Sequence, residues 1–228
     1  EYIESGDENY QWPAMDDDAA CGLCYTSGTT GNPKGVLYAH KSNILHAQAA
    51  LIGLTISPDE SILMVVPLFH VLAWGTPYFA PMFGLKLVMP GMQMEGEPLY
   101  DLIEKEEVTL AFGVPTVWMG LLSYCRDNNK ILNSVKNTVI GGSALSLAIL
   151  KEFDEVHDVN VIQGWGMTEM SPLGTSNFLT EEMKKMSKED RYAVQLKQGR
   201  PMYGIELKVV DDSGNELPKD GESQGHLL

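Results

Sequence analysis

The chain has 228 residues, of which 44% are hydrophobic and 21% are charged, which is the composition of a soluble globular protein with a sizeable core. Its net charge of -15 excludes a role that depends on binding nucleic acid or an anionic membrane surface, because those partners need a basic footprint. Three cysteines give no disulfide framework, which favours a cytoplasmic protein. The chain starts at Glu1 without an apolar leader, so we expect it to be part of a longer protein.

The first residues, 1–18, are acidic and aperiodic, and we expect them to form a connection. They lead into an expected strand at Ala19–Tyr25, a polar loop and a second strand at Gly35–Tyr38. Ser42 is then the expected N-cap of a helix that continues to about Leu51.

From there apolar strand patterns alternate with helix-like segments. The expected strands are Ile62–Val66, Lys86–Met89, Thr109–Phe112, Val135–Ile140 and Val159–Gln163, and the expected helices are Pro98–Glu106, Pro115–Cys125 and Leu147–Val156. Strands and helices in alternation predict an α/β protein with a layered, mostly parallel sheet and flanking helices.

The run Ile62–Leu85 contains no Asp, Glu, Lys or Arg and is long enough to span a membrane. Prolines and glycines interrupt it repeatedly, and His70 lies inside it. We therefore expect a strand, a loop and a short helix that line an apolar cavity, and no transmembrane segment.

The alternation stops near Phe178. Residues 180–197 are charged and helical in composition, with a helix start at Ser187. Beyond Gly199 the pattern becomes β, with an expected strand at Ile205–Val210 and a turn at Asp211–Asn215. We therefore divide the chain into an incomplete α/β core, residues 1–198, and the beginning of a β-rich subdomain, residues 199–228.

The loop between the first two strands is rich in groups that can hold phosphate. Its hydroxyl side chains are those of Thr26, Ser27, Thr29 and Thr30, its glycines are Gly28, Gly31 and Gly35, and Lys34 adds a positive charge. Glycines let backbone N–H groups converge on anionic oxygens, and hydroxyls add donors. Pro33 precedes the lysine and a strand follows it, so this loop differs from the phosphate loop that opens a helix. The composition alone is also that of a plain surface turn.

A second polar segment, Gln163–Glu169, follows the last of the alternating strands. Trp165 offers a flat face for a purine base, Thr168 offers a hydroxyl for a phosphate, and Glu169 offers a hard oxygen for Mg²⁺. By itself this pattern is equally typical of a tryptophan that packs a sheet edge beside a surface carboxylate.

The order of the residues favours the binding interpretation. Tyr-Thr-Ser-Gly-Thr-Thr-Gly-x-Pro-Lys-Gly-Val, residues 25–36, closely resembles the phosphate loop of the adenylate-forming enzymes, the acyl-CoA synthetase and luciferase superfamily. Trp-Gly-Met-Thr-Glu, residues 165–169, resembles the second signature of that family, although Trp165 stands where tyrosine is commonest. The resemblance covers nearly the whole chain and implies the large N-terminal domain of such an enzyme. A ribose-binding aspartate, a hinge and a mobile C-terminal domain with an essential lysine would lie beyond Leu228.

The resemblance also implies roles for single residues. Thr26 and Glu169 would bind Mg²⁺, while Trp165, Gly141 and Gln163 would seat adenine. The residues expected to act in catalysis are Lys34, His70, Thr168 and Glu169. The residues expected to bind the nucleotide or the acid are Thr26, Ser27, Gly28, Thr29, Thr30, Gly31, Lys34, Val71, Trp74, Gly141, Gly142, Gln163, Gly164, Trp165 and Thr168.

The segment Pro67–Trp74 bears on the substrate. Pro-x-Phe-His-x-x-x-Trp resembles the part of fatty acyl-CoA synthetases in which the histidine lies beside the reacting carboxylate and the tryptophan gates an acyl tunnel. Related domains that activate amino acids place an aspartate near this histidine, and no acidic residue occurs between Ile62 and Leu85. An uncharged acid is therefore expected.

The implied reaction joins a medium- or long-chain fatty acid to coenzyme A through an acyl-adenylate, with ATP and Mg²⁺. Residues 1–228 alone are expected to adenylate poorly or not at all, and a homodimer follows only from the resemblance. Three alternatives stay open: a non-catalytic nucleotide- or acyl-binding module, a phosphotransferase, and an adenylating enzyme for an aryl acid or a short thioether acid.

Overall fold

The computed structural model describes residues 3–26 and 31–228. Within these residues a seven-stranded sheet forms the centre of the molecule, with the strand order β4-β3-β5-β6-β7-β8-β9. The strands are β3 (Ser61–Met64), β4 (Lys86–Val88), β5 (Leu110–Gly113), β6 (Asn137–Ile140), β7 (Asn160–Gly166), β8 (Leu173–Asn177) and β9 (Arg200–Pro201). The first five strands in this order, from β4 through β3 to β7, are parallel. Strand β8 is antiparallel to β7, and β9 is antiparallel to β8. The predicted α/β class and the mostly parallel sheet are confirmed.

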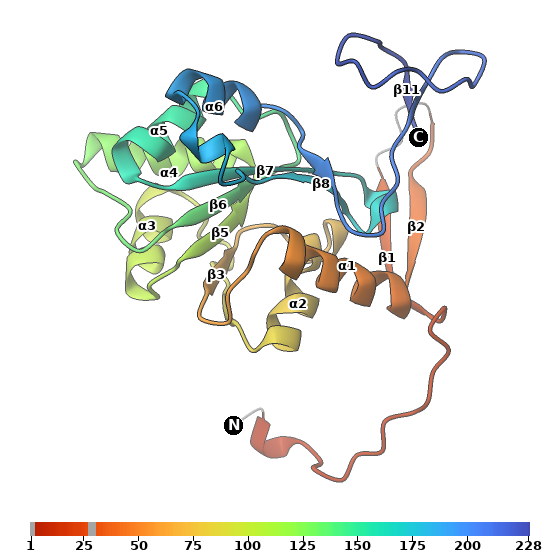
Figure 1. Cartoon of the computed structure of the whole chain (residues 1–228). Helices are drawn as coiled ribbons and strands as arrows, with labels where there is room; N and C mark the ends of the chain where they lie inside the picture. The colour runs from red at the N-terminus through yellow and green to blue at the C-terminus, as the bar shows by residue number, and fades with distance from the viewer. Residues whose placement is uncertain (1–2, 27–30) are drawn as a thin grey trace.

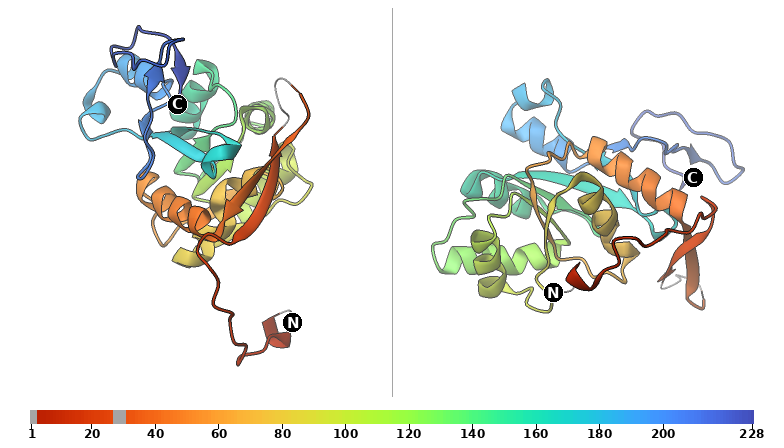
Figure 2. Two further views of the ribbon diagram at one scale, coloured as in Figure 1. Left: turned by 90° about the vertical axis from the view of Figure 1, so that its right-hand side faces the viewer. Right: turned by 90° about the horizontal axis from the view of Figure 1, so that it is seen from below.

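Helices cover both faces of the sheet (Figure 1, Figure 2). Helices α1 (His40–Gly53) and α2 (Thr76–Phe83) pack on one face around a core that includes Phe79, Phe112 and Ile162. The other face carries α3 (Gly96–Lys105), α4 (Pro115–Asp127) and α5 (Leu147–His157). Their larger core is built around Trp118 and Phe153, whose rings meet edge to face with centroids 6.1 Å apart. The sheet is thus buried on both sides, which explains its continuous apolar strands.

A β-hairpin stands at one end of this sandwich (Figure 1). It consists of β1 (Ala20–Thr26) and β2 (Lys34–Ala39), paired antiparallel, so the polar loop connects two strands as predicted. The segment before it, with the short turn η1 (Ile3–Ser5), extends away from the body of the molecule in Figure 1 and in the left view of Figure 2. At the other end of the chain, β10 (Val209–Val210) and β11 (His226–Leu227) form a small separate pair.

The uncharged run Ile62–Leu85 folds as predicted into a strand, a loop and short helical segments. They are β3, the turn η2 (Val71–Gly75) and α2. Among the residues that the structure describes, no helix is both long and apolar enough to cross a membrane.

Two local expectations are wrong. Ser42 is not the N-cap of α1, because the helix already begins at His40 and the Ser42 hydroxyl donates to the Ala39 carbonyl within the first turn, at 3.0 Å. The strand expected at Ile205–Val210 is reduced to Val209–Val210. Arg200–Pro201 pairs with β8 in the main sheet, and the division of the chain near Gly199 stays a prediction.

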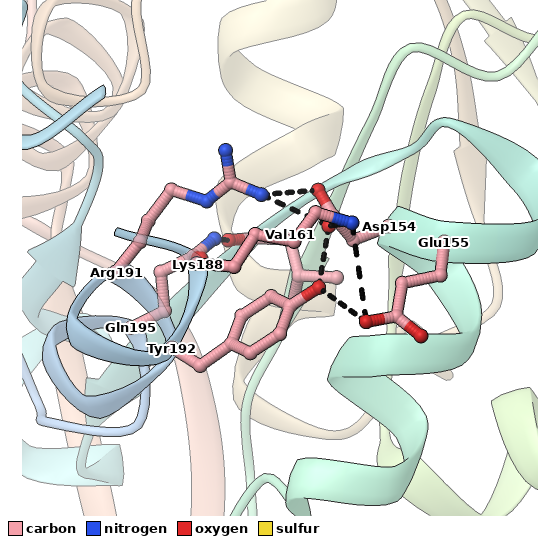
Figure 3. Close-up of polar contacts among 7 residues, drawn as sticks. All are labelled: Asp154, Glu155, Val161, Lys188, Arg191, Tyr192 and Gln195. Atoms are coloured by element: carbon pink, nitrogen blue, oxygen red, sulfur yellow. Dashed lines mark hydrogen bonds and ion pairs between the residues drawn. The ribbon is translucent and has the colours of Figure 1, made fainter. Parts of the chain in front are cut away.

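Helix α6 (Lys188–Gln195) is fastened to α5 and β7 by a group of polar side chains (Figure 3). Its N-cap is Ser187, as predicted, whose side chain accepts a hydrogen bond from the Asp190 N–H. Arg191 Nη2 donates to both carboxylate oxygens of Asp154, at 2.8 and 2.9 Å, and the Tyr192 hydroxyl donates to the same carboxylate. Burial raises the pKa of Asp154, but the hydrogen bond from Tyr192 and the positive charge of Arg191 outweigh it and hold that pKa below its ordinary value.

Asp154→Ala should lower the free energy of unfolding by about 2–3 kcal/mol, because Arg191 and the Tyr192 hydroxyl lose their shared acceptor. The folded-state pKa of Asp154 is depressed, so its contribution is full at neutral pH and is lost as the pH falls below about 4. Urea unfolding at pH 7 and in acid measures both effects. Glu181→Ala, which removes the exposed ion pair with Lys184, is the control and should change stability by less than about 0.5 kcal/mol. A loss for Asp154→Ala that is equal at both pH values would contradict the assignment.

Candidate active site

A hollow of about 220 Å³ opens where the parallel strands end. Ligands in open α/β sheets bind outside the carboxyl ends of the strands, and β5, β6 and β7 all point their carboxyl ends at this hollow. Its walls come from α1, from the turn after β3, from these strand ends and from the start of β8. The lining residues are Ala50, Leu54, His70, Val71, Trp74, Phe112, Val139, Gly141, Gly142, Gly164, Trp165, Gly166, Met167, Thr168, Pro172 and Leu173.

Glycines form one flat wall of the hollow. A Cβ atom added to Gly141 would lie 2.7 Å from the Gly164 carbonyl oxygen and 3.3 Å from the Trp74 ring. Gly142 has a φ of 78°, a conformation that side chains rarely adopt, and a Cβ there would lie 3.7 Å from the same ring. The absence of side chains therefore lets the Trp74 ring lie against the ends of β6 and β7.

Trp74 is presented by a left-handed turn of the backbone. The φ angles of Val71, Leu72, Ala73 and Trp74 are 46°, 45°, 49° and 55°, and Gly75 follows at 81°. Each non-glycine residue in this region costs roughly 1–2 kcal/mol, and such strain gathers at functional sites. The turn η2 places Val71 and Trp74 together on the wall of the hollow.

Buried side chains hold this strained turn in place. Thr76 is fully buried, and its hydroxyl donates to the Ala73 carbonyl at 2.9 Å. The His46 ring, from α1, lies so close to Gly75 that an added Cβ would be 2.5 Å from two of its atoms. Burial lowers the pKa of His46 to about 4, so this imidazole is neutral at physiological pH. No sequence motif includes His46, and the apolar helical spacing around it gives no signal of this contact.

The base of the hairpin meets the second polar segment. Strand β1 packs beside the short turn η3 (Thr168–Met170), and the Tyr38 hydroxyl donates to the Thr168 carbonyl. Burial raises the pKa of Tyr38, and the nearby Cys24 and Glu169 raise it further. Glu169 is exposed, and Thr26 follows Cys24 by two residues along β1. Tyr38 therefore links the strands that carry the polar loop to Thr168 and Glu169.

The predicted residues fall into three groups. The hollow brings together His70, Val71, Trp74, Gly141, Gly142, Gly164, Trp165 and Thr168. Outside its lining lie Thr26, Gly31 and Lys34 on the hairpin, Glu169 beside it, and Gln163, which is buried in β7. Ser27, Gly28, Thr29 and Thr30 lie outside the described residues.

The residues present fit a magnesium nucleotide. Gly141, Gly142 and Trp165 line the same hollow, where a planar base can meet backbone and an aromatic ring, and the exposed Glu169 carboxylate is a hard ligand of the kind that Mg²⁺ prefers. Gln163 Oε1 is buried and finds no hydrogen-bond partner among the described residues, but Gln163 does not line the hollow.

Tyr38→Phe should lower kcat/KM by about 2- to 10-fold, since one hydrogen bond to the Thr168 carbonyl is lost and η3 is held less firmly. The matched control is Tyr25→Phe on the same hairpin, where the side chain is 67% exposed and the change should have no effect. The measurement is pyrophosphate release by the full-length protein, which is the reaction that the resemblance implies. Equal activity in Tyr38→Phe and the unaltered protein would show that this contact does not position Thr168.

These features describe an α/β protein with a ligand site at the carboxyl ends of its parallel strands. The AMP-binding enzyme family model matches residues 2–228. The chain therefore belongs to the AMP-binding enzyme family, as the resemblance in its two polar segments indicated.

Individual relatives agree with this assignment. The chain is 48% identical to a medium-chain-fatty-acid–CoA ligase from Ectopseudomonas oleovorans over 99% of its own length and 42% of that protein. It is 47% identical to a 3-methylmercaptopropionyl-CoA ligase from Ruegeria lacuscaerulensis, over 100% of its own length and 43% of that protein. O-succinylbenzoate CoA synthetase from Bacillus subtilis, solved with ATP and magnesium, superposes with a TM-score of 0.78 at 26% identity, over 99% of this chain and 44% of that one. The chain thus spans about two fifths of the length of the curated relatives it matches.

Proposed function

We propose that the protein containing this chain is an ATP-dependent ligase that activates an uncharged carboxylic acid, a fatty acid or a related acid, and transfers it to coenzyme A. One observation carries the proposal. The hollow joins glycines at the strand ends, suited to a nucleotide, to apolar side chains such as Leu54 and Phe112, suited to an acyl chain. The names of the relatives, which ligate fatty and thioether acids to coenzyme A, support the same reaction class.

The chemistry needs two displacements. A carboxylate oxygen of the acid attacks the α-phosphorus of ATP, which forms an acyl-adenylate and releases pyrophosphate. The thiol of coenzyme A then attacks the acyl carbon and displaces AMP. The protein contributes mainly by positioning the reactants and neutralising charge.

Residues in different parts of the site would bind the base, the phosphates, the metal and the acid. Trp165, Gly141 and Gln163 would seat the base, Thr168 would contact the α-phosphate, and His70 at the rim of the hollow would orient the carboxylate. Thr26 and Glu169 would hold Mg²⁺, which supplies positive charge against the phosphates when bound. Lys34 and the hydroxyls and glycines of the loop would hold the outer phosphates.

The apolar interior favours an acid without a second charge. Ala50, Leu54, Phe112 and Val139 line it, and no acidic residue between Ile62 and Leu85 could pair with a substrate ammonium group. A medium- or long-chain fatty acid is therefore the first candidate substrate, with a short thioether acid or an aryl acid as the alternative. We also infer a cytoplasmic homodimer, with residues 199–228 opening a second, β-rich subdomain.

Analysis of the nucleotide products tests the proposal. The full-length protein, incubated with ATP, Mg²⁺, coenzyme A and a series of acids, should form AMP, pyrophosphate and the acyl-CoA, whereas residues 1–228 alone should form little or none. ADP as the product would identify a phosphotransferase instead. Tight ATP binding without any pyrophosphate from the full-length protein would identify a non-catalytic binding module.

A further inference from the structure

Residues 67–70 lie between strand β3 and the strained turn η2, and His70, the last of them, lines the hollow. All four residues are exposed, and the Phe69 side chain is 83% exposed, so the core does not anchor this segment. Two backbone hydrogen bonds shape it locally. The His70 N–H donates to the Pro67 carbonyl at 2.9 Å, and the Ala73 N–H donates to the His70 carbonyl at 3.0 Å. Neither bond fixes the segment against a neighbouring strand.

Cys24, on β1 of the hairpin, makes the contact that reaches this segment from outside. Its thiol donates to the Phe69 carbonyl, with 3.6 Å between sulfur and oxygen. Among residues 3–26 and 31–228, it is the only side chain that hydrogen-bonds to residues 67–70. The Phe69 carbonyl belongs to the planar peptide unit that joins Phe69 to His70. A bond to that oxygen therefore fixes the direction in which the chain enters His70.

The inner face of the hairpin is itself firmly held. Cys24 is only 4% exposed and packs with Tyr38 and Val71 in a small core between the hairpin and η2. On the paired strand, the Tyr38 hydroxyl donates to the Thr168 carbonyl. The hairpin thus contacts both walls of the hollow, the one that carries His70 and the one that carries Thr168.

We propose that Cys24 is a positioning residue, whose thiol sets the place of His70 relative to Thr168 through the Phe69 carbonyl. The inference rests on the proposed function, in which His70 orients the carboxylate of the acid and Thr168 contacts the α-phosphate. Cys24 does not line the hollow, so its influence on the reaction passes through His70. Small displacements of the reacting groups lower the rate, and loss of this bond should therefore impair use of the acid more than binding of ATP.

Two substitutions separate this role from simple packing. Cys24→Ser keeps a hydrogen-bond donor but places a polar hydroxyl in an apolar core, whereas Cys24→Val keeps apolar volume in a strand and removes the donor. If Cys24 only fills space, the valine variant should be both the more stable and the more active of the two. If its thiol positions His70, the serine variant should be the more active although it is the less stable. Cys125→Ser is the matched control, since Cys125 is fully buried in α4 and lies outside the lining of the hollow.

The experiment uses the full-length protein with octanoate, ATP, Mg²⁺ and coenzyme A, with AMP formation as the readout and urea unfolding as the measure of stability. Cys24→Val should lower kcat/KM for octanoate by about 3- to 10-fold, which corresponds to one hydrogen bond, while KM for ATP changes by less than about twofold. Cys24→Ser should keep kcat/KM for octanoate within about twofold of the unaltered protein, although it unfolds at a lower urea concentration than Cys24→Val. Cys125→Ser should lose stability and keep both kinetic constants within about twofold.

The outcomes separate this inference from the proposed function. A Cys24→Val protein at least as active toward octanoate as the Cys24→Ser protein would overturn the role of the thiol. Equal rises in KM for octanoate and for ATP would overturn it too, because a general loss of structure affects both substrates alike. An unaltered full-length protein that forms no AMP with any acid would contradict the proposed function, and this inference with it.

Discussion

Glu169→Gln should lower kcat/KM for pyrophosphate release by roughly 10²- to 10³-fold, comparable to the loss of one group that stabilises transition-state charge, because Mg²⁺ would lose a carboxylate ligand. Glu169 is exposed on η3, beside the hairpin that carries Thr26 and Lys34, and the change keeps its shape while removing its charge. The lower activity should appear as a higher Mg²⁺ concentration needed for the half-maximal rate, together with a lower kcat. Initial rates over a range of Mg²⁺ concentrations measure both.

The matched control for this substitution is Glu182→Gln. Glu182 is likewise exposed and precedes a short 3-10 turn, η4 (Met183–Lys185), but it lies outside the lining of the hollow. Its replacement should leave the rate within twofold of the unaltered protein. Glu169→Gln with normal activity and normal Mg²⁺ dependence would remove Glu169 from the metal site.

Gly141→Ala should also cost about 100-fold in kcat/KM, because a shift of about 1 Å at the reacting groups is enough for such a loss. The new methyl group would lie 2.7 Å from the Gly164 carbonyl oxygen and 3.3 Å from the Trp74 ring. Since the first neighbour is backbone, β6 and β7 must separate or the Trp74 turn must move. We expect stability to fall by about 1–3 kcal/mol at the same time.

Gly120→Ala is the matched control for Gly141→Ala. A Cβ at Gly120, on the exposed face of α4, meets no described atom within 4 Å, and alanine favours the helix by about 0.5–1 kcal/mol. This variant should keep full activity and unfold at a slightly higher urea concentration. A Gly141→Ala protein with unchanged kcat/KM would show that the strand ends do not bind the reactants.

Much of the sheet could be predicted because its strands are buried on both faces. Short continuous apolar runs such as Ile62–Val66 and Val159–Gln163 separated by amphipathic helices predict parallel strands, and β3 and β7 lie there. Strand β8 (Leu173–Asn177) was missed because Gly174, Ser176 and Asn177 have little strand propensity. Its backbone hydrogen bonds to β7 and the burial of its polar side chains override that preference.

The site was predicted only in part, because motifs lie along the chain while the site is assembled across it. His70, Trp74, Gly141 and Trp165 stand in motifs that resemble a known family, and the structure brings them together at one hollow. Tyr38 contacts Thr168 from a strand that is far away in the sequence, and no local sequence pattern predicts such a contact. The sequence Val71–Gly75 does not predict a left-handed turn either, because four of its five residues disfavour that conformation.

A crystal structure of the full-length protein with ATP and Mg²⁺ tests the account most directly. The account predicts one Mg²⁺ that oxygens of Thr26 and Glu169 coordinate at about 2.1 Å, with the base against Trp165 and the Gly141–Gly142 wall. A nucleotide bound elsewhere, or Thr26 and Glu169 too far apart to coordinate the same ion, would contradict it.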